Sequence, residues 1–550
     1  MSTRADLAVS GSDPVETPES PSASPAADGR VEEALERDRL RRRLRVFDLP
    51  DRVAGWFWSL AVFALALVLR LQGLGDIRTL VFDETYYVKD GYTIWRHGAE
   101  MAWPDEPNAA FEAGRVDTYL SQGEYVVHPP VGKWVIGAGE ALLGADSPWG
   151  WRISVALLGA LSVLMVARIG RRLFRSTAIG AIAGLLLAVD GLHLVMSRTG
   201  LLDLVLSFFV LAAFGALLID RDRFRAHLAE GGARIAAAGV ALPSLGIRAG
   251  LRPWRITAGV LLGLACGVKW SGLYVLAVFG IMTVLWDWWA RRRLGERRWL
   301  ENGLFRDAIP AFFVMVGGAF LTYLASWSGW FASSDGFHRH WAETEGGYAG
   351  GNGVLNALRS LWHYHAEAYA FHVGLDTPHT YQASPLGWLL QIRPTNFYYR
   401  QYDYGQMGCE VAKCAAQINS VGNPLIWWLG TAAILVCLVA GLVWRDGRAL
   451  AALAGIVGGY LPWMLYLHRT IFTFYSVVYE PFLVLCLAYA LGLLLGPRHA
   501  DRDRRLAGTL FTGSLLVLIV LVSAFFWPIW TGQTIPLEQW RWRMWLPTWP

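Results

Sequence analysis

Charged residues are scarce in this chain: they make up 17% of its 550 residues, against about 25% in a typical soluble protein. Hydrophobic residues account for 54%, and the mean hydropathy is +0.33. Many apolar runs approach the roughly 20 residues that cross a bilayer. Five cysteines are too few to hold together a fold of this size. The composition therefore excludes a water-soluble enzyme, a fibrous protein and a disulfide scaffold, and it indicates a membrane protein.

Lysine is the rarer basic residue: only four of the 49 basic side chains are lysine, and the other 45 are arginine. A genome rich in G and C accounts for most of such a bias. A lysine in such a sequence is therefore a slightly better functional candidate than a lysine in a sequence of ordinary composition. The four are Lys89, Lys133, Lys269 and Lys413.

The first 50 residues are polar and then basic, and they contain no apolar core of a cleavable signal peptide. Their Ser-, Pro- and charge-rich beginning predicts disorder up to about residue 30. Residues 31–46 fit either a basic helix on anionic lipid or a plain tail. We expect residues 1–50 to form a disordered, basic cytoplasmic tail.

Eleven apolar segments follow, and each is a candidate membrane span. Their approximate bounds are 55–73, 149–169, 177–195, 201–219, 255–269, 271–290, 308–326, 425–444, 449–467, 472–495 and 507–527. Glycine and polar residues at 267–272 predict a tight hairpin at the membrane surface rather than one long helix. The expected fold class is an all-α polytopic membrane protein with about eleven transmembrane helices.

Arginine clusters predict which loops face the cytoplasm. They lie at 168–175, 221–225, 291–298 and 498–505. Loops rich in Lys and Arg stay on the cytoplasmic side, and eleven spans place all four clusters there together with the N-terminus. The C-terminal tail, 528–550, then lies outside the plasma membrane.

Two long loops, about 74–148 and about 327–424, also fall on the outer face. Loops longer than about 15 residues are usually functional or disordered. These two are rich in Trp, Tyr, His and Gly, so we expect them to be folded and functional. Cys409 and Cys414 in the second loop form either a disulfide on an oxidising face or two free thiols.

Nucleotide-binding and zinc-protease motifs are missing. No GxxxxGK[ST], GxGxxG, HExxH or paired CxxC pattern occurs in a convincing context. Nothing indicates a nucleotide-driven pump or a bound dinucleotide, and we expect no nucleic-acid partner.

The first outer loop opens with two adjacent carboxylates, Asp83 and Glu84, between aromatic residues such as Phe82 and Tyr86. Adjacent side chains point in different directions on a helix or a strand. One carboxylate can therefore face a reacting centre while the other orients it. A solvated acidic pair is the ordinary alternative, but the aromatic flank and the place at the membrane surface favour a functional role.

Basic side chains gather at the same boundary, together with Asp203. They are His128, Lys133, Arg152, Arg198, Lys269 and Arg469. Ionisable residues at this depth are costly and tend to be functional, and such cations suit a lipid phosphate. Two alternatives stay open: Arg152 either snorkels or pairs with a loop carboxylate, and Lys269 either snorkels or binds the phosphate.

These residues lie in motifs that together resemble the protein O-mannosyltransferase family in its actinobacterial form. In chain order the motifs are Phe82-Asp83-Glu84, His128-Pro129-Pro130, Arg152 opening a long apolar span, Arg198 with Leu201-Leu202-Asp203, Lys269-Trp270-Ser271-Gly272, Ser326-Trp327-Ser328-Gly329-Trp330-Phe331, Pro385-Leu386-Gly387-Trp388 with Arg393-Pro394, and Arg469 with Phe472. The resemblance covers about 55–545. The second outer loop is too short for the β-trefoil repeats of the eukaryotic members.

The resemblance implies a GT-C glycosyltransferase fold with two membrane modules, 51–326 and 425–550, separated by the outer loop 327–424. It implies transfer of mannose from polyprenyl-phospho-mannose to Ser or Thr of secreted proteins at the outer face of the plasma membrane, with inversion at the sugar. The implied partners are this lipid donor, secreted acceptor proteins, membrane lipids and the secretion translocon.

The resemblance also implies site residues. The catalytic group is Asp83 as general base, Glu84 as an acceptor-binding or orienting residue, and Arg152 facing both. The donor phosphate is assigned to His128, Lys269, Arg198 and Arg469, and the acceptor loop to Tyr86, Trp327 and Arg393. We assign no metal ligand. A divalent metal stays open, because it would require residues such as Asp83, Glu84 and His128 to converge.

Two other functions fit the sequence less well. Another GT-C transferase would use a lipid-linked sugar to build cell-wall glycan or to modify a lipid. The His128-Pro129-Pro130 element and the block 326–331 favour a protein acceptor instead. A transporter would place ionisable groups near the bilayer midplane and often has an internal repeat, whereas here the polar groups gather in two outer loops.

Overall fold

The computed structural model describes residues 25–49, 51–497 and 500–550, and most of them are helical. The predicted disorder of the first residues falls largely on 1–24, outside the described residues. Helix α1 (Pro25–Arg43) begins earlier than the basic helix predicted from residue 31. Leu40 in its last turn and Leu44 just after it are buried with Phe224 and Leu228 of a long helix, α9. The basic segment is therefore packed on the protein.

Eight helical segments among the described residues are long and apolar enough to cross a membrane. They are α2 (Arg52–Leu71), α6 (Pro148–Phe174), α9 (Leu202–Ala237), α11 (Gly272–Leu294), Trp299–Ser326, α18 (Pro424–Leu442), Gly447–Tyr466 and α21 (Arg502–Thr531). Shorter apolar helices are α7 (Thr177–Val189), α10 (Pro253–Val268) and α20 (Glu480–Leu495). These segments coincide in position with the eleven predicted ones, and the number that crosses the bilayer stays a prediction.

Two of the long segments contain irregular turns. Trp299–Ser326 consists of α12 (Trp299–Gly303), the π-helix η1 (Leu304–Ala308), α13 (Ile309–Phe312), the π-helix η2 (Phe313–Gly317) and α14 (Gly318–Ser326). Gly447–Tyr466 consists of α19 (Gly447–Gly459) and the 3₁₀ helix η4 (Leu461–Tyr466). Pro462 lies in the first turn of η4, where its missing amide hydrogen cannot continue the hydrogen bonding of α19.

Other predicted spans are interrupted, and a polar cap explains one of these interruptions. Asp190 ends α7 and accepts a hydrogen bond from the Leu192 amide, so the predicted span 177–195 is split into α7 and α8 (Gly191–Met196). The 3₁₀ helix η5 (Thr473–Val478) precedes α20, where the sequence predicted one continuous span. The predicted hairpin at 267–272 is confirmed, because α10 ends at Val268 and α11 begins at Gly272.

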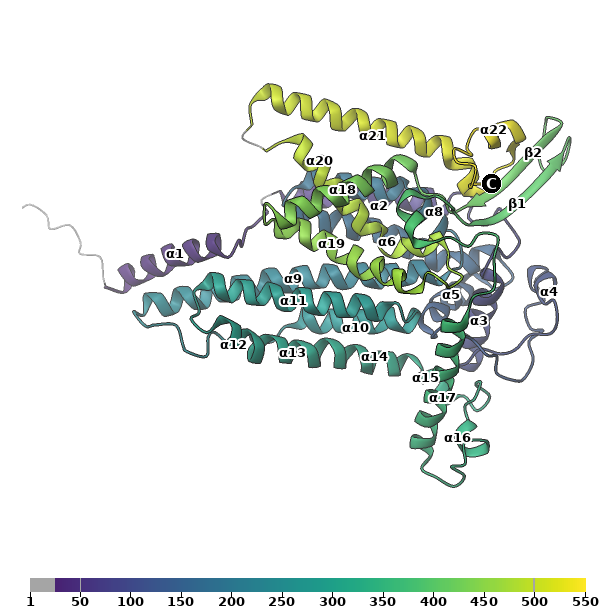
Figure 1. Cartoon of the computed structure of the whole chain (residues 1–550), viewed down its shortest axis with the longest axis horizontal. Coiled ribbons are helices and arrows are strands. Elements are labelled where there is room, and N and C mark those ends of the chain that lie inside the picture. The colour runs from purple at the N-terminus through teal and green to yellow at the C-terminus, as the bar shows by residue number, and fades with distance from the viewer. Residues whose placement is uncertain (1–24, 50, 498–499) are drawn as a thin grey trace, which may run out of the picture.

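The membrane-length helices run side by side, and the two long loops fold at one end of them (Figure 1). The first loop contains α3 (Glu84–His97), α4 (Asn108–Glu112) and α5 (Val131–Leu143); the second contains α15 (Ser328–Ala332), α16 (Trp341–Thr344), α17 (Gly353–Gly374) and the 3₁₀ helix η3 (Pro385–Leu390). The prediction that both loops are folded is confirmed. Helices α1 and α12 lie toward the opposite end.

A small antiparallel sheet, which the sequence did not predict, lies beside these loop helices. Its order is β1 (Asn396–Asp403), β2 (Lys413–Asn419) and β3 (Ile535–Pro536), and α22 (Leu537–Arg541) follows it. Cys409, in the turn between β1 and β2, forms a disulfide with Cys414 of β2, which decides between the two alternatives left by the sequence.

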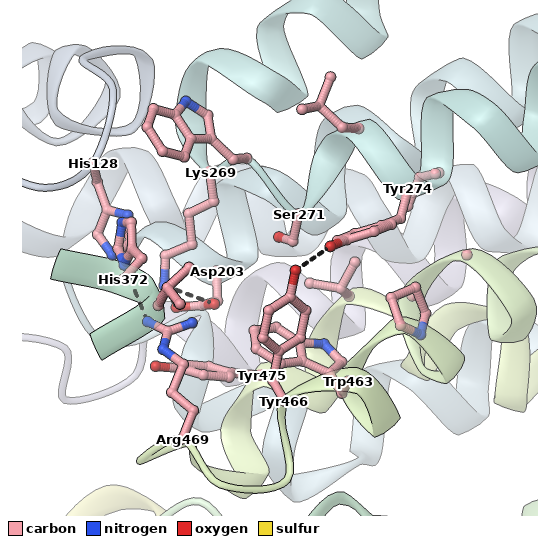
Figure 2. Close-up of a pocket in the computed structure, with 18 of the residues that line it drawn as sticks. His128, Asp203, Lys269, Ser271, Tyr274, His372, Trp463, Tyr466, Arg469 and Tyr475 are labelled. Carbon is pink, nitrogen blue, oxygen red and sulfur yellow. Dashed lines mark hydrogen bonds and ion pairs between the residues drawn. The ribbon is translucent and has the colours of Figure 1, made fainter. Parts of the chain in front are cut away.

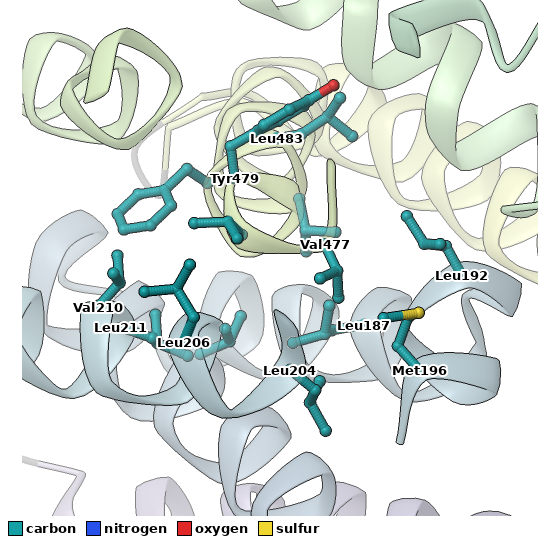
Figure 3. Close-up of a cluster of buried hydrophobic side chains, with 14 of the residues drawn as sticks. Leu187, Leu192, Met196, Leu204, Leu206, Val210, Leu211, Val477, Tyr479 and Leu483 are labelled. Atoms are coloured by element: carbon teal, nitrogen blue, oxygen red, sulfur yellow. The ribbon is translucent and has the colours of Figure 1, made fainter. Parts of the chain in front are cut away.

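The core is centred on α9, whose apolar window is 72% buried. Side chains of α7, α8, η5 and α20 form one buried cluster with it, as Figure 3 shows for Leu187, Met196, Val477 and Leu483. Helices in a bilayer associate through close packing rather than through the hydrophobic effect. Gly180 of α7 illustrates this, since a Cβ there would lie 2.5 Å from the Ala167 carbonyl oxygen of α6.

Candidate active site

A cavity of about 300 Å³ opens where the first loop, the α10–α11 turn, α17 and the segment from α19 to η5 meet (Figure 2). Most of its wall is apolar or aromatic, and this part includes Trp270, Leu273, Val275, Pro462 and Trp463. Its polar residues include His128, Asp203, Lys269, His372 and Arg469. The cavity therefore offers an apolar surface beside a cluster of polar and charged groups.

Asp83 lies beside this polar cluster, directly before α3. The preceding residue, Phe82, has a left-handed backbone with φ +50°, which is uncommon for a non-glycine residue. Its ring holds this conformation by packing on Phe397, Phe472 and Phe474 at centroid distances of 5.1, 5.6 and 5.5 Å. The aromatic flank seen in the sequence thus fixes the backbone that carries Asp83.

The surroundings of Asp83 suit a base. Burial raises the pKa of its carboxyl to about 6, while the Lys269 ammonium lowers it and the Asp203 carboxylate raises it further. The Tyr87 hydroxyl lies 3.5 Å from Asp83 Oδ2 and donates toward it. A carboxylate with a pKa close to 7 accepts protons more readily than an ordinary aspartate and is still mostly ionised at pH 7.

Glu84 has a different role, because all of its acceptor positions are used. Arg152 donates to both carboxylate oxygens, from Nε at 2.8 Å and from Nη2 at 2.7 Å. The backbone amides of Gly200 and Val81 donate the other two hydrogen bonds, at 2.7 and 3.0 Å. Both charged side chains are buried. Of the two roles predicted for Glu84, the geometry favours orienting.

Arg152 fixes the loop that leads to Asp83. Besides Glu84 it donates to the carbonyl oxygens of Leu74, Ile77 and Thr79 at 3.3, 2.7 and 3.0 Å. The alternative that Arg152 pairs with a loop carboxylate is therefore confirmed. The pair holds residues 74–84 against the start of α6.

Lys269 lies in the cavity wall, in the turn between α10 and α11. Its Nζ donates to both oxygens of Asp203, at 3.0 and 2.8 Å, and lies 4.9 Å from the centre of the Tyr475 ring (Figure 2). The ammonium is therefore anchored by a carboxylate inside the protein. Its charge is already partly balanced before a ligand arrives.

The positive charge of Arg469 is less compensated by neighbouring groups than that of Lys269. Its Nη2 lies 3.1 Å from Nδ1 of His372, and its buried Nε has no acceptor in the part of the chain that the structure describes. The Nε2 atom of His372 lies 2.8 Å from the Val127 carbonyl oxygen and donates to it, so Nδ1 is the acceptor for Arg469. A free donor on a cation beside an apolar cavity is suited to an anionic ligand.

The two histidines of the cavity are neutral. Burial, assisted by nearby cations such as Lys269, holds the pKa of His128 well below its usual range. Burial likewise lowers the pKa of His372 to about 4, although its bond to Val127 opposes this. The rings lie 5.0 Å apart between centroids. His128 can therefore act as a neutral hydrogen-bonding group, whereas the sequence analysis counted it among the cations for the phosphate.

Other predicted site residues lie away from the cavity wall. Arg198 donates to the carbonyl oxygens at the end of α2, including those of Arg70 and Gln72 at 2.9 and 2.6 Å, and so caps that helix. Arg393 donates to the carbonyl oxygens of Thr548 and Pro550 and holds the C-terminal tail.

Trp327 and Tyr86 are also separate from the lining. Trp327 is buried in an aromatic cluster with Trp330 and Tyr364. Tyr86 is 61% exposed on α3. The acceptor roles assigned to Trp327 and Arg393 therefore receive no support from their contacts.

His372 is the functional candidate that sequence reasoning missed. It belongs to no motif, and its nearest partners, Val127 and Arg469, are about 245 and 97 residues away in the chain. The metal option also receives no support at this site. Among the described residues, the one group of three His, Cys, Asp or Glu side chains close enough to hold an ion lies elsewhere, and Glu84 is fully engaged by other donors.

Two family models match the chain. The model of dolichyl-phosphate-mannose-protein mannosyltransferase matches residues 60–305, and the model of the C-terminal four TMM region of protein-O-mannosyltransferase matches residues 357–549. Both cover the helices and loops that form the cavity.

The similarity to named relatives covers almost the whole chain. The polyprenol-phosphate-mannose–protein mannosyltransferase of Mycobacterium tuberculosis is 39% identical over 516 residues, which cover 91% of this chain and 92% of that protein. The protein of the same name from Corynebacterium glutamicum is 35% identical over 510 residues, covering 90% and 94%.

The fold is also that of a solved structure. The Saccharomyces cerevisiae protein O-mannosyltransferase Pmt1-Pmt2 complex bound to the sugar donor matches with a TM-score of 0.68 over 94% of each chain, at 14% identity. The resemblance inferred from the motifs is thereby confirmed. With 39% identity over more than nine-tenths of both proteins, this chain belongs to the protein O-mannosyltransferase family, a family of glycosyltransferases.

Proposed function

We propose that this chain transfers mannose from polyprenyl-phospho-mannose to Ser or Thr hydroxyls of secreted proteins, at the outer face of the plasma membrane. The observation that carries the proposal is the cavity itself. Its apolar wall fits a prenyl chain, its cations fit a phosphate, and Asp83 lies beside them with a pKa near 6. The names of the relatives from Mycobacterium tuberculosis and Corynebacterium glutamicum agree with this donor and with a protein acceptor.

The donor would lie with its prenyl chain on the apolar wall and its phosphate at Arg469. This arginine supplies the unpaired Nε donor. Lys269 would add a second positive charge, and the neutral His128 a hydrogen bond. Charge-assisted hydrogen bonds to phosphate are about twice as strong as neutral ones, so these residues would hold the leaving group in place.

The reaction is a single displacement. The acceptor hydroxyl oxygen attacks C1 of mannose, the bond between C1 and the phosphate oxygen breaks, and its electron pair stays on the polyprenyl phosphate. The hydroxyl proton passes to the Asp83 carboxylate. Attack from the face opposite the phosphate inverts the configuration at C1, as in single-displacement glycoside chemistry. No acid is needed, because the cations stabilise the departing phosphate.

The arginine clusters indicate on which side of the membrane this reaction takes place. They favour placing the ends near α1 and α12 in the cytoplasm, with the two loops and the C-terminus outside. An acceptor chain leaving the secretion translocon would then reach the cavity from the outer face.

A transfer assay tests the proposal. The purified full-length protein is incubated with labelled polyprenyl-phospho-mannose and a Ser/Thr-rich peptide. We expect label on the hydroxyl side chains, and none when every Ser and Thr of the peptide is replaced by Ala. A glycan or lipid acceptor is offered in parallel. Transfer only to that acceptor would show a different GT-C activity.

A further inference from the structure

Three metal-ligating side chains converge in the second outer loop, separately from the candidate active site. His363 and Glu367 lie one turn apart on α17, and His338 reaches them from the segment between α15 and α16. Each offers one ligand atom, and these atoms all lie within 4.8 Å of one another. The side chains are 27%, 40% and 20% exposed respectively, so an ion could enter from solvent.

The distances within this group resemble those of a zinc site. The Nε2 atom of His338 lies 3.0 Å from Glu367 Oε2, and Nε2 of His363 lies 3.4 Å from Glu367 Oε1. Zinc bonds of roughly 2.0–2.2 Å in tetrahedral geometry separate neighbouring ligand atoms by about 3.4 Å. Two imidazoles and one carboxylate are ligands that zinc prefers, and they leave a fourth position for water.

The two imidazoles are held in place by aromatic neighbours. The ring of His363 is stacked on Trp341 at 3.7 Å and an angle of 4°. His338 packs against Phe337 at 4.1 Å and has a left-handed backbone with φ +56°. The ligand atoms are thus positioned by contacts other than those they make with each other, as in a preorganised site.

The three ligands lie on segments that pack beside the cavity of the candidate active site. Phe337, next to His338, packs on Tyr125 of the first loop and on Tyr364 of α17. The Tyr364 hydroxyl donates to the Val126 carbonyl oxygen at 2.7 Å. Farther along α17, His372 and Tyr369 line the cavity. An ion at the group would therefore fix α17 and the first loop together.

We propose that His338, His363 and Glu367 bind Zn²⁺ and that the bound ion braces α17 against the segment between α15 and α16, which packs on the first loop. The role proposed for the ion is to hold these segments together, with no contact to the donor or the acceptor. The proposal rests on the ligand geometry and is independent of the proposed transferase function, because its test measures metal binding.

The test compares four forms of the full-length protein, purified and stripped with a chelator: wild type, His338→Asn, Glu367→Gln and His340→Asn. His340 is the matched control, since it lies two residues from His338 and contacts Glu343 instead. Each form is titrated with ZnCl₂ in a calorimeter. Replacing the zinc by Co²⁺ provides a second readout, because four-coordinate cobalt gives strong visible absorption.

We expect one saturable zinc site in the wild type and in His340→Asn. In His338→Asn and Glu367→Gln the affinity should fall by more than the roughly 10–100-fold that loss of a mere outer-sphere partner causes. Zinc should raise the melting temperature of the first two forms and not of the last two. This second comparison separates a lost site from a misfolded variant, since all four stripped forms should melt at similar temperatures.

Two results would overturn the proposal. One is a stripped wild type that binds no more zinc than His338→Asn, which would leave the group as imidazole–carboxylate hydrogen bonds only. The other is an equal loss of zinc affinity in His340→Asn, which would mean that the ion is not bound by the proposed three ligands.

Discussion

Replacing Asp83 by Asn tests the proposed chemistry most directly. The change removes the proton acceptor and keeps nearly the same shape. A positioned general base contributes roughly 10²–10⁴-fold to the rate, so we expect transfer to fall by that factor. Donor binding should be nearly unchanged, because the phosphate is assigned to Arg469 and Lys269 and not to Asp83.

The pH dependence gives the prediction a second, quantitative part. With a pKa of about 6, about nine-tenths of the Asp83 carboxyls are ionised at pH 7 and about one-tenth at pH 5. The wild-type rate should therefore fall close to tenfold between these values. His372, whose pKa is lowered to about 4, should not titrate above pH 5. Burial lowers the pKa of His128 in the same direction. In Asp83→Asn the residual rate should be almost flat over the same range.

The stability of the fold should depend on pH in the opposite direction to the transfer rate: it should fall as the pH rises. Burial raises the folded-state pKa of Asp83 from 3.8 to about 6, so ionisation between these pH values opposes folding. At pH 7 the cost is at most about 3 kcal/mol, reduced by the water that reaches this half-buried group. Asp83→Asn should therefore melt at the same temperature as the wild type or higher, and the difference should vanish below pH 4.

The assay is single-turnover transfer to a Ser/Thr peptide from pH 5 to pH 8, with melting curves of the same samples. Asp105→Asn is the matched control, since Asp105 is an exposed carboxyl of the same loop. It should retain wild-type activity and the wild-type pH profile. A variant at position 83 that keeps half its activity, or a wild-type profile that is flat from pH 5 to pH 7, would refute the assignment of the base.

Further predictions concern the phosphate, the buried ion pair and the topology. Lys269→Met should weaken donor use by roughly tenfold or more, since one charge-assisted bond is worth about 1.5–3 kcal/mol, and Arg469→Gln should do the same while leaving the acceptor curve unchanged. An unaltered donor curve in either folded variant would remove that residue from the phosphate site. Arg152→Met leaves the buried Glu84 charge without its ion-pair partner, so stability should fall by about 3–5 kcal/mol, measured by thermal denaturation; a small loss would mean that water and the two backbone amides compensate the carboxylate. Single cysteines near Glu112 and Thr548 should react with an impermeant thiol reagent in whole cells, and one near Glu296 should not. Labelling of the last would overturn the orientation.

The membrane segments were predictable from the sequence because hydrocarbon thickness imposes a length that apolar runs reveal directly. Their ends were less predictable. A carboxylate at Asp190 breaks one run through a local cap, and no hydropathy window contains that information. Helix α9 continues to Ala237, well beyond the predicted end at 219, because Phe224 and Leu228 pack against α1.

The site was partly predictable for a related reason. Asp83 and Glu84 are adjacent, so their different orientations follow from backbone geometry alone. Arg198 was assigned to the phosphate from its charge and depth, but its donors are used by carbonyl oxygens at the end of α2. A sequence shows which residues carry donors and not which acceptors lie within reach. For the same reason His372 was missed, since only folding brings it to Arg469.

The charges of the cavity form a balance that the proposed reaction would preserve. Lys269 is paired with Asp203, and the two histidines are neutral, so Arg469 and Asp83 remain as opposite charges beside the donor. When the sugar leaves, a phosphodiester with one negative charge becomes a phosphomonoester with up to two. In the same step the acceptor proton neutralises Asp83. The negative charge added to the phosphate is therefore removed from the carboxylate, and the site passes through the transfer without a net change in buried charge. Because isolated charges are costly in such an environment, this exchange explains why a base with a raised pKa belongs beside a phosphate leaving group.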